Sequence, residues 1–440
     1  MIVGIRREDK NRWERRAPLI PEHMRDLARD HGLRFVVQPS PIRAFPDAAY
    51  AAAGAEVNED LSAADVVLAV KEVPISLFRA GKTYLFFSHT LKGQRHNMPM
   101  LRRVLDLGCT LIDYERIVDD QCRRLIFFGR YAGLAGMIDA LWALGRRFEW
   151  EGVATPLGRI EPAHRYPDLA AARAAFREVA DRIAAGGLPE AAGPIVVGLA
   201  GYGNVSRGAQ EILDLFPVEE LSPPRLLDPS FDAGALDRRT VYKVVFREEH
   251  MAAPIDAGKP FDLAEYYSHP ERYRGLFPSY VPSLTVAANC IFWEARFPRL
   301  VSIADARALW AGPRPRCRVL ADISCDVGGG IEVNDHCTDP GDPVYVWDLD
   351  KGASSSGVAG KGPIVLAVDN LPCELPRESS AEFGALLSRF LPAIARAELT
   401  RPPAESGLPV EMQRGVIAYQ GRLTPAFAYL QEHLDRAAEG

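Results

Sequence analysis

Short apolar runs alternate with amphipathic stretches through residues 1–130. The apolar runs predict strands at 1–5, 34–38, 65–70, 83–88 and 110–114, and the stretches between them predict helices at 21–32 and 94–108. The run from Val66 to Val70 is apolar at every position, which is typical of a central strand in a parallel sheet. Because strands and helices alternate, we expect a parallel α/β sheet in this part of the chain.

The alternation continues beyond residue 130 with a second set of elements. Apolar faces predict a long helix at 131–150, which we expect to link two domains rigidly, and another helix at 168–185. A second α/β unit is predicted to run from Pro194 to about residue 375, and its Ser/Gly-rich stretch at 352–362 predicts a mobile loop. Helices are predicted at 381–399 and 425–438. We therefore expect two sheets of the same type, with the end of the chain returning to the first.

Composition and charge narrow the classes of function. The 440 residues are enough for two or three domains. The 52 basic and 58 acidic residues give a net charge of −6, which argues against a nucleic-acid-binding protein. No apolar run is long enough for a transmembrane helix, and the first residues lack the apolar core of a signal peptide. Seven scattered cysteines without a Cys-x-x-Cys pair are typical of reduced thiols, so we expect a cytoplasmic protein.

The sharpest local motif is the glycine-rich turn after the apolar run at 195–200. Gly201 permits a tight turn, and Gly203 lets a pyrophosphate approach the exposed N–H groups at the start of the next helix. Ser206 stands at the third glycine position of the dinucleotide-binding fingerprint, where its small side chain still allows close packing. A strand before the turn and a helix after it support dinucleotide binding over an ordinary turn.

The charged residues after this turn leave the cofactor preference open. Glu219 and Glu220 stand at the distance along the chain at which an acid binds the adenosine ribose, which favours NAD. Arg207 and Arg225 lie near them in sequence and are suited to holding the 2′-phosphate of NADP.

Ionisable side chains follow three predicted strands of the first sheet. Lys71 and Glu72 follow the first of these strands, His89 and Lys92 follow the second, and Glu115 follows the third. Ligands of open α/β sheets bind beyond the carboxyl ends of the strands, so these residues are candidates for one site. A lysine and a histidine at such a place are suited to proton transfer.

Arg16 and Arg124 add guanidinium groups that are suited to binding carboxylates in a two-donor geometry. Together with a nicotinamide cofactor, these groups favour oxidation of an amine that carries carboxylates. Two further strand ends are candidate cofactor contacts: the Gly-rich turn at 322–330 and the polar segment at 365–372. Cys325 with the triplet at 335–337 does not have the spacing of a zinc site, so no metal is predicted.

Five segments carry a resemblance to a known family: Arg6–Leu19, Phe86–Thr90, Gly201–Gln210, His269–Tyr273 and Asp322–Asp326. They resemble the lysine–ketoglutarate reductase domain, which is the N-terminal half of the bifunctional aminoadipic semialdehyde synthases. More distantly, the chain is similar to lysine-forming saccharopine dehydrogenase and alanine dehydrogenase. The resemblance implies an α/β fold of two Rossmann-type doubly wound domains with an interdomain cleft. It also implies a split substrate domain, 1–133 and 378–440, around a dinucleotide-binding domain at 134–377.

The resemblance assigns roles to individual residues. The catalytic pair would be Lys71 and His89. The substrate-binding residues would be Arg16, Glu72, Lys92, Glu115 and Arg124. The resemblance adds Asp326 and Asn370 to the cofactor-binding residues predicted from the glycine turn and its spacing, which are Gly201, Gly203, Asn204, Val205, Ser206 and Glu220.

The implied activity is the reductive condensation of L-lysine with 2-oxoglutarate to saccharopine, or the reverse reaction. The resemblance favours NADP, and NAD is the alternative. Another amino-acid or opine dehydrogenase, of the alanine or carboxyethyl-ornithine type, is the first rival function, and a non-catalytic nucleotide-sensing module is the second. We expect small-molecule substrates and neither nucleic acid nor membrane as partners. Because no saccharopine-oxidising half follows in this sequence, a separate enzyme would take that step. The amine donor, the direction and the formation of a homo-oligomer stay open.

Overall fold

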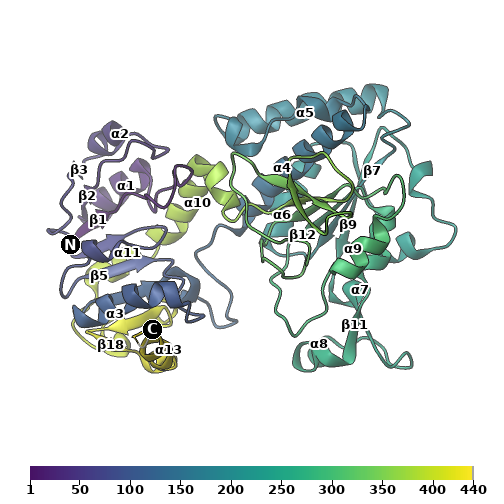
Figure 1. Cartoon of the computed structure of the whole chain (residues 1–440). Helices are drawn as coiled ribbons and strands as arrows, with labels where there is room; N and C mark the ends of the chain where they lie inside the picture. The colour runs from purple at the N-terminus through teal and green to yellow at the C-terminus, as the bar shows by residue number, and fades with distance from the viewer. Residues whose placement is uncertain (439–440) are drawn as a thin grey trace. The chain divides into compact units, whose positions relative to one another are not determined.

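The computed structural model describes residues 1–438. The chain divides into two compact units (Figure 1). Unit 1 consists of residues 1–128 together with the segment from 376 onward, and unit 2 consists of residues 129–375. Each unit is built around a largely parallel, eight-stranded sheet, so the predicted α/β class with two sheets of the same type is confirmed.

The unit 1 sheet has the order β18-β17-β6-β5-β4-β1-β2-β3. Its strands are β1 (Ile2–Ile5), β2 (Arg34–Val37), β3 (Glu56–Val57), β4 (Val66–Leu68), β5 (Thr83–Phe86), β6 (Thr110–Asp113), β17 (Val416–Tyr419) and β18 (Arg422–Leu423). The first six are parallel and follow the doubly wound order, whereas β17 adds to β6 in the antiparallel direction. The five strands predicted here from the apolar runs are all present.

Helices cover the unit 1 sheet: α1 (Pro21–His31), α2 (Asp47–Ala52), α3 (Met98–Asp106), α10 (Pro376–Ser388), α11 (Leu391–Arg396), α12 (Val410–Gln413) and α13 (Leu430–Ala438). Helix α1 contacts α10, and α3 contacts α13 (Figure 1). The single helix predicted at 381–399 is wrong, because the chain breaks between α10 and α11. Pro392, in the first turn of α11, has no N–H group with which to continue the earlier helix.

The unit 2 sheet has the order β15-β14-β16-β13-β12-β7-β9-β8. Its strands are β7 (Ile195–Ala200), β8 (Val218–Glu220), β9 (Val241–Phe246), β12 (Val286–Asn289), β13 (Val319–Asp322), β14 (Val344–Asp348), β15 (Ala353–Ser356) and β16 (Ile364–Leu366). The segments β10 (Ala252–Pro254) and β11 (Tyr273–Gly275) form a separate antiparallel pair. Alternate residues of β7 enter different apolar clusters on the two faces, which explains why this strand is apolar throughout.

Six helices are assigned to unit 2: α4 (Gly129–Trp150), α5 (Leu169–Gly186), α6 (Asn204–Leu213), α7 (Glu248–Met251), α8 (Leu263–Ser268) and α9 (Ile303–Leu309). Helix α4 was expected to link two domains, but it packs inside unit 2 against α6 and the sheet. Glycines make this packing close, since a Cβ on Gly133 would lie 1.8 Å from the carbonyl oxygen of Val205 and one on Gly208 would lie 2.0 Å from that of Arg130. The predicted mobile loop at 352–362 contains β15, which pairs with β14.

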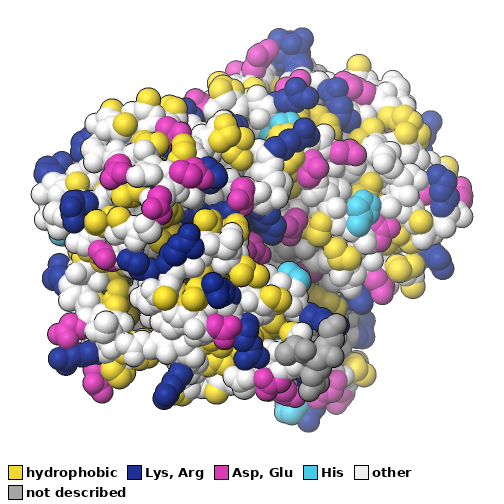
Figure 2. Space-filling model, turned by 60° about the vertical axis from the view of Figure 1, so that its left-hand side comes forward, with side chains coloured by type: hydrophobic (Ala, Val, Ile, Leu, Met, Phe, Trp, Pro, Cys, Tyr) yellow, Lys and Arg dark blue, Asp and Glu magenta, His cyan; other side chains and the backbone are white. Residues whose placement is uncertain are grey.

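The described surface agrees with the near-balanced charge of the sequence. Figure 2 shows Lys and Arg side chains intermingled with Asp and Glu on the face that it presents. Among the described helices, none combines the length and the apolarity that spanning a membrane requires.

Candidate functional site

The polar residues predicted in unit 1 follow adjacent strands of its sheet. Strand β1 lies between β2 and β4, so the chain order reverses direction at the β1–β4 boundary. Ligands of doubly wound sheets bind at the carboxyl ends of the strands beside such a reversal. Lys71 follows β4, His89 follows β5 and Glu115 follows β6, which brings these three positions to the same edge of the sheet.

Glu72 and His89 form the clearest pair at this edge. His89 Nδ1 lies 2.6 Å from Glu72 Oε1, and Lys10 Nζ lies 3.7 Å from Glu72 Oε2. Burial opposes ionisation of Glu72, but its hydrogen bond to His89 and the nearby positive charges outweigh that effect and lower its pKa to about 2. His89 has a φ of 50°, a left-handed conformation that is uncommon outside glycine. Because Glu72 engages Nδ1, the imidazole is oriented with Nε2 directed away from this carboxylate.

A buried carboxyl group holds the strand end that carries Lys71. The N–H groups of Val70 and Lys71 donate to the two oxygens of Glu8 at 2.7 and 3.0 Å. Burial, and then the charge of Glu14, raise the pKa of Glu8 to about 7, while Arg6 and the two N–H groups act in the opposite direction. Sequence analysis missed Glu8. Its position shortly after β1 was the available signal, because β1 is one of the two strands at which the strand order reverses. Glu8 positions the Lys71 backbone at the edge where ligands bind.

Arg16 is buried and already engages a carboxylate of its own chain. Its Nε and Nη2 donate to the two oxygens of Glu14 at 2.7 and 2.6 Å, and its guanidinium carbon lies 4.2 Å from the centre of the Phe128 ring. The next residue, Ala17, donates its N–H to Ser380 Oγ at 2.9 Å, which ties this loop to α10. Glu14 therefore occupies the two-donor edge that the predicted substrate carboxylate would use.

Glu115 and Arg124, both predicted to line the substrate site, form an ion pair. Arg124 Nη2 donates to Glu115 Oε1 at 3.1 Å, and the Arg124 side chain is more than half exposed. Asp113 fixes the neighbouring strand ends because it accepts from the N–H groups of Ser88 and Glu115 at 2.9 and 2.7 Å. Burial raises the pKa of Asp113 to about 6. Lys92 is exposed in the segment after His89.

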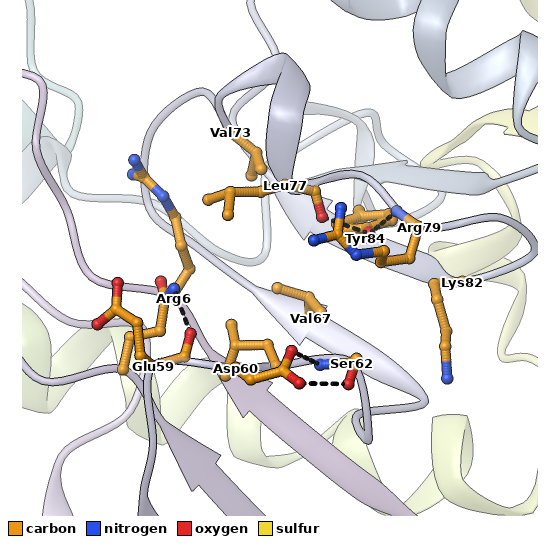
Figure 3. A pocket seen from close by; sticks show the side chains of 12 residues that line it. Arg6, Glu59, Asp60, Ser62, Val67, Val73, Leu77, Arg79, Lys82 and Tyr84 are labelled. Carbon is orange, nitrogen blue, oxygen red and sulfur yellow. Dashed lines mark hydrogen bonds between the residues drawn. The ribbon is translucent and has the colours of Figure 1, made fainter.

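A small cavity elsewhere in unit 1 is too small to be the substrate site (Figure 3). Its volume is about 60 Å³, whereas ligand sites usually enclose roughly 300–1,000 Å³. Several of its polar groups are also engaged with their neighbours. Tyr84 Oη accepts from the Arg79 N–H at 2.7 Å, and Asp60 accepts from the Ser62 N–H and hydroxyl at 2.8 and 2.7 Å.

The glycine-rich turn of unit 2 lies between β7 and α6. Gly201 has a φ of 101°, and a Cβ there would lie 2.5 Å from Ile291 Cγ2, so both the conformation and the space require glycine. Gly203 is the N-cap residue of α6, and it has no side chain that could bond the N–H groups of the first turn. A Cβ added at Gly203 would have no neighbouring atom within 4 Å. The open space at Gly203 and the N–H groups of the first turn, at Asn204 and Val205, fit a pyrophosphate.

A cavity of about 450 Å³ opens beside this turn. It is lined by Gly201, Gly203 and segments that follow β9 and β12, the two strands that flank β7. Its aromatic side chains are Tyr202, Tyr266, Tyr267, Phe292, Trp293 and Phe297. The size and the aromatic walls fit a flat heterocycle next to the pyrophosphate position. Ser206 is buried behind the turn, where its hydroxyl accepts from Gln210 Nε2 at 3.2 Å.

Glu220 does not lie where its sequence spacing predicts. It ends β8, the outermost strand, and β9 separates β8 from β7. Two strand spacings, about 10 Å, therefore lie between β8 and the strand that leads into the glycine turn. Glu220 instead faces Lys243, with Oε2 4.0 Å from Nζ.

Glu248 takes the place expected of Glu220. It follows β9, directly beside β7, and lines the cavity with Gly201. Tyr267 donates its hydroxyl to Glu248 Oε1 at 2.7 Å, and Tyr202 Oη lies 3.5 Å from the same oxygen. Sequence analysis missed this residue. The apolar run at 241–246 before it was the available signal, but the sequence did not show that this run pairs with β7.

Buried polar side chains organise the next strand ends. Asp322, at the end of β13, accepts from the amides of Asn289 and Asn334 at 2.8 Å each. Burial raises the pKa of Asp322 to about 6, against the effect of the two amides. Asp326 lies half-buried in the turn after β13, and Asn370 caps the 3₁₀ turn after β16. The strands that they follow, β13 and β16, are separated from β7 by β12. Neither residue lines the cavity beside Gly201.

Cys325 and the triplet at 335–337 do not form a metal site. The His336 ring lies against Asp335, with Nδ1 2.5 Å from Oδ1. Among residues 1–438, no cluster of three or more His, Cys, Asp or Glu side chains has the geometry to hold a metal ion.

Comparison with known proteins shows which proteins the chain is similar to. Residues 4–135 match the model of the family "Alanine dehydrogenase/PNT, N-terminal domain". Over 98% of its length the chain is 38% identical to the α-aminoadipic semialdehyde synthase of Arabidopsis thaliana, of which it spans 41%. The predicted family resemblance is therefore confirmed, and the chain spans less than half the length of this relative.

Two further comparisons cover most of the chain. A saccharopine dehydrogenase [NAD(+), L-lysine-forming] of Emericella nidulans is 24% identical over 88% of this chain and 90% of that protein. A solved L-alanine dehydrogenase superposes on 99% of this chain and 100% of its own with a TM-score of 0.63 and 18% identity. The second comparison confirms the predicted fold class, with two Rossmann-like sheets.

Proposed function

We propose that this chain is a nicotinamide-dependent oxidoreductase that condenses L-lysine with 2-oxoglutarate to saccharopine, or catalyses the reverse reaction. The observation that carries the proposal is the 38% identity over 98% of the chain to an α-aminoadipic semialdehyde synthase. The lysine-forming saccharopine dehydrogenase named above supports the same reaction, because this chain spans 90% of its length. The Lys71, Glu72 and His89 group supplies the ionisable side chains that such a reaction needs.

The cofactor-binding role falls to the turn and cavity of unit 2. The N–H groups at the start of α6 hold the pyrophosphate, and the aromatic cavity takes a flat ring. When bound, a nicotinamide supplies or accepts the hydride. Gly203→Val would place a side chain in the space that the pyrophosphate needs. It should weaken dinucleotide binding without unfolding the protein, because the substitution meets no neighbour.

Proton transfer falls to Lys71 and His89. Condensation requires loss of a proton from the attacking amine and protonation of the hydroxyl that leaves as water. His89 is oriented by Glu72 through Nδ1, so Nε2 is the atom that exchanges the proton with the substrate. Glu8 fixes the backbone of Lys71, so the lysine side chain starts from a held position at the carboxyl end of β4. Arg124 and Lys92, both exposed, are the groups that bind substrate carboxylates.

In this proposal, the carboxylate of Glu248 sets the relative affinity for NAD and NADP. A carboxylate at the end of the strand beside the glycine turn accepts hydrogen bonds from ribose hydroxyls and repels a 2′-phosphate. The family resemblance favours NADP, whereas Glu248 favours NAD. Glu248→Gln should raise the ratio of kcat/KM with NADP to that with NAD by about tenfold, because hydrogen bonds to a carboxylate are worth roughly 1.5–3 kcal/mol. Glu220→Gln is the matched control and should leave the ratio unchanged.

The deciding assay follows NADH or NADPH oxidation with 2-oxoglutarate and a panel of amines, with L-lysine and L-ornithine first. We expect a signal that depends on L-lysine. Lys71→Met should lower kcat by a factor of about 10²–10⁴, the usual contribution of a general acid or base, with nucleotide affinity retained. Lys259→Met, at an exposed position in unit 2, is the control. A signal with alanine or ornithine and none with lysine would instead favour the rival amino-acid or opine dehydrogenase.

A further inference from the structure

Two cysteines lie next to each other at the carboxyl end of β13. Cys325 is in the turn that follows this strand, Cys337 is twelve residues later, and their sulfur atoms are 3.7 Å apart. Cys325 is half-buried and Cys337 is exposed. A disulfide has a sulfur–sulfur distance of about 2.05 Å, so a shift of about 1.6 Å would bring the two atoms to bonding distance. Rotation of the exposed Cys337 side chain can supply such a shift.

The backbone around the two cysteines is held in place. Cys325 has a φ of 51°, and its N–H donates to Asp322 Oδ1 at 3.2 Å. Its thiol lies 3.0 Å from the carbonyl oxygen of Ala367, and the N–H of Thr338, the residue after Cys337, donates to the same oxygen at 2.8 Å. One carbonyl group of the segment after β16 therefore anchors both cysteine-bearing segments, which keeps the two sulfurs close.

Cys337 is the thiol that we expect to react first, because it is exposed whereas Cys325 is half-buried. The hydrogen bond that it receives from the Cys325 thiol lowers its pKa, so more of it is present as the nucleophilic thiolate. The buried cysteines behave differently, since burial raises the pKa of Cys317 to about 12 and also raises that of Cys290. Cys122 is exposed as well, but it belongs to unit 1, whereas the pair belongs to unit 2.

We propose that Cys325 and Cys337 form a reversible disulfide and are a redox modification site of this protein. The oxidant is a low-molecular-weight disulfide such as glutathione disulfide. The Cys337 thiolate attacks one sulfur of glutathione disulfide, so a mixed disulfide forms and one glutathione leaves as a thiolate. Cys325 then gives up its proton, attacks the Cys337 sulfur and releases the second glutathione as a thiolate, which takes up a proton. The protein loses two electrons and two protons, and glutathione disulfide is reduced to two molecules of glutathione.

The disulfide would close the Gly-rich turn at 326–330 into a loop. Arg299 donates to the carbonyl oxygens of Gly328 and Gly329, and its guanidinium lies 4.9 Å from the Trp293 ring. Trp293 lines the cavity beside Gly201, so these contacts connect the loop to that cavity. This consequence rests on the proposed function: oxidation should change the dissociation constant of the nicotinamide dinucleotide. Formation of the disulfide itself does not depend on the proposed function.

The experiment equilibrates the whole protein with mixtures of glutathione and glutathione disulfide, blocks the remaining thiols and maps peptides without reduction. We expect a cross-linked peptide that contains Cys325 and Cys337 and has the mass of two hydrogen atoms less than the two thiol peptides together. The number of free thiols should fall by two, and dithiothreitol should restore both. Nucleotide affinity is measured on the same oxidised and reduced samples by equilibrium binding.

Three variants separate the possible outcomes. Cys325→Ser should stop at the glutathione adduct on Cys337, and Cys337→Ser should abolish the reaction at this site. Cys122→Ser should retain the cross-link. The proposal is overturned if the wild-type protein accumulates a stable glutathione adduct on Cys337 without the cross-link, or if neither cysteine reacts while Cys122 does. A cross-link that leaves nucleotide affinity unchanged would support the modification site and refute only its connection to the cavity.

Discussion

A double-mutant cycle that exchanges the side chains of Asp322 and Asn334 measures how much the buried hydrogen bonds of Asp322 contribute to stability. The Asp322 carboxylate accepts one amide hydrogen bond from Asn289 and one from Asn334, and all three residues are at most 1% exposed. Asp322→Asn keeps the shape of the side chain but replaces one carboxylate oxygen with an NH2 group. This new donor then faces the amide donor of Asn289 or Asn334. A buried group left unsatisfied in this way costs about 1–3 kcal/mol, so we expect a destabilisation of about 2 kcal/mol.

The reverse substitution and the double variant complete the cycle. Asn334→Asp alone places two carboxylates together in a buried site, which should cost about 3 kcal/mol or more. In the double variant, the new Asn at 322 donates to the new Asp at 334, which also accepts from the Tyr345 hydroxyl that is 3.1 Å from Asn334 Oδ1. The double variant should therefore return to within about 1 kcal/mol of the wild type, a coupling of several kcal/mol.

Urea unfolding of the whole chain is a suitable assay for the cycle. Five of the six tryptophans lie in unit 2, at positions 142, 150, 293, 310 and 347, so tryptophan fluorescence reports mainly on the unit that contains the substitutions. Circular dichroism provides the signal of both units. If the double variant is as unstable as the sum of the two single variants, the three side chains do not form the complementary group described here, and the reasoning is refuted.

Three further predictions test other features. Gly208→Ala should destabilise the protein by about 2–3 kcal/mol, because the added Cβ would meet the Arg130 carbonyl group. The control Gly186→Ala places its Cβ where no atom lies within 4 Å, so it should change stability by less than about 1 kcal/mol. Equal urea midpoints for the two variants would contradict this. Burial raises the pKa of Glu374 from 4.5 to about 8, so its stabilising contribution is complete below pH 4.5 and is lost as the pH rises through 8. Glu374→Gln should therefore flatten the decline of the unfolding free energy over this range by up to roughly 5 kcal/mol, as measured by urea unfolding at several pH values. An unchanged decline would argue against this origin. Arg16→Lys should lower the stability of unit 1 by about 1–3 kcal/mol, because lysine cannot make the two-donor contact with Glu14. Amide hydrogen exchange measures this change, and unaltered exchange would show that the contact contributes little.

The elements that the sequence predicts well are those with a strong local signal. The strands at 1–5, 34–38 and 195–200 are apolar on both faces, because helices cover both sides of a parallel sheet. The turn at Gly201 is also local, since its φ of 101° and the nearby Ile291 side chain leave room only for glycine. The polar edge strand at 353–356 has no apolar pattern, so its Ser/Gly composition indicated a loop instead.

The details that the sequence does not predict depend on pairing between distant segments. Glu220 has the expected spacing from Gly203, but the order of β8 and β9 in the sheet moves it to the edge and brings Glu248 to the cavity. Likewise, the sequence shows Arg16 as a candidate for binding a substrate carboxylate, but only the structure shows that Glu14 engages it. Roles for Lys71 and His89 stay predictions that the proposed assays test.

The return of the chain to unit 1 has a consequence for biosynthesis. Unit 2 is one continuous segment, so all its strands have left the ribosome once residue 375 has emerged. Strand β6 of unit 1, in contrast, gains its neighbour β17 only after residues 416–419 have been synthesised. Until then, β6 presents an unpaired edge, the kind of surface that recruits strands from other chains. The nascent amino-terminal sheet is therefore the part of this protein for which a chaperone matters most during translation.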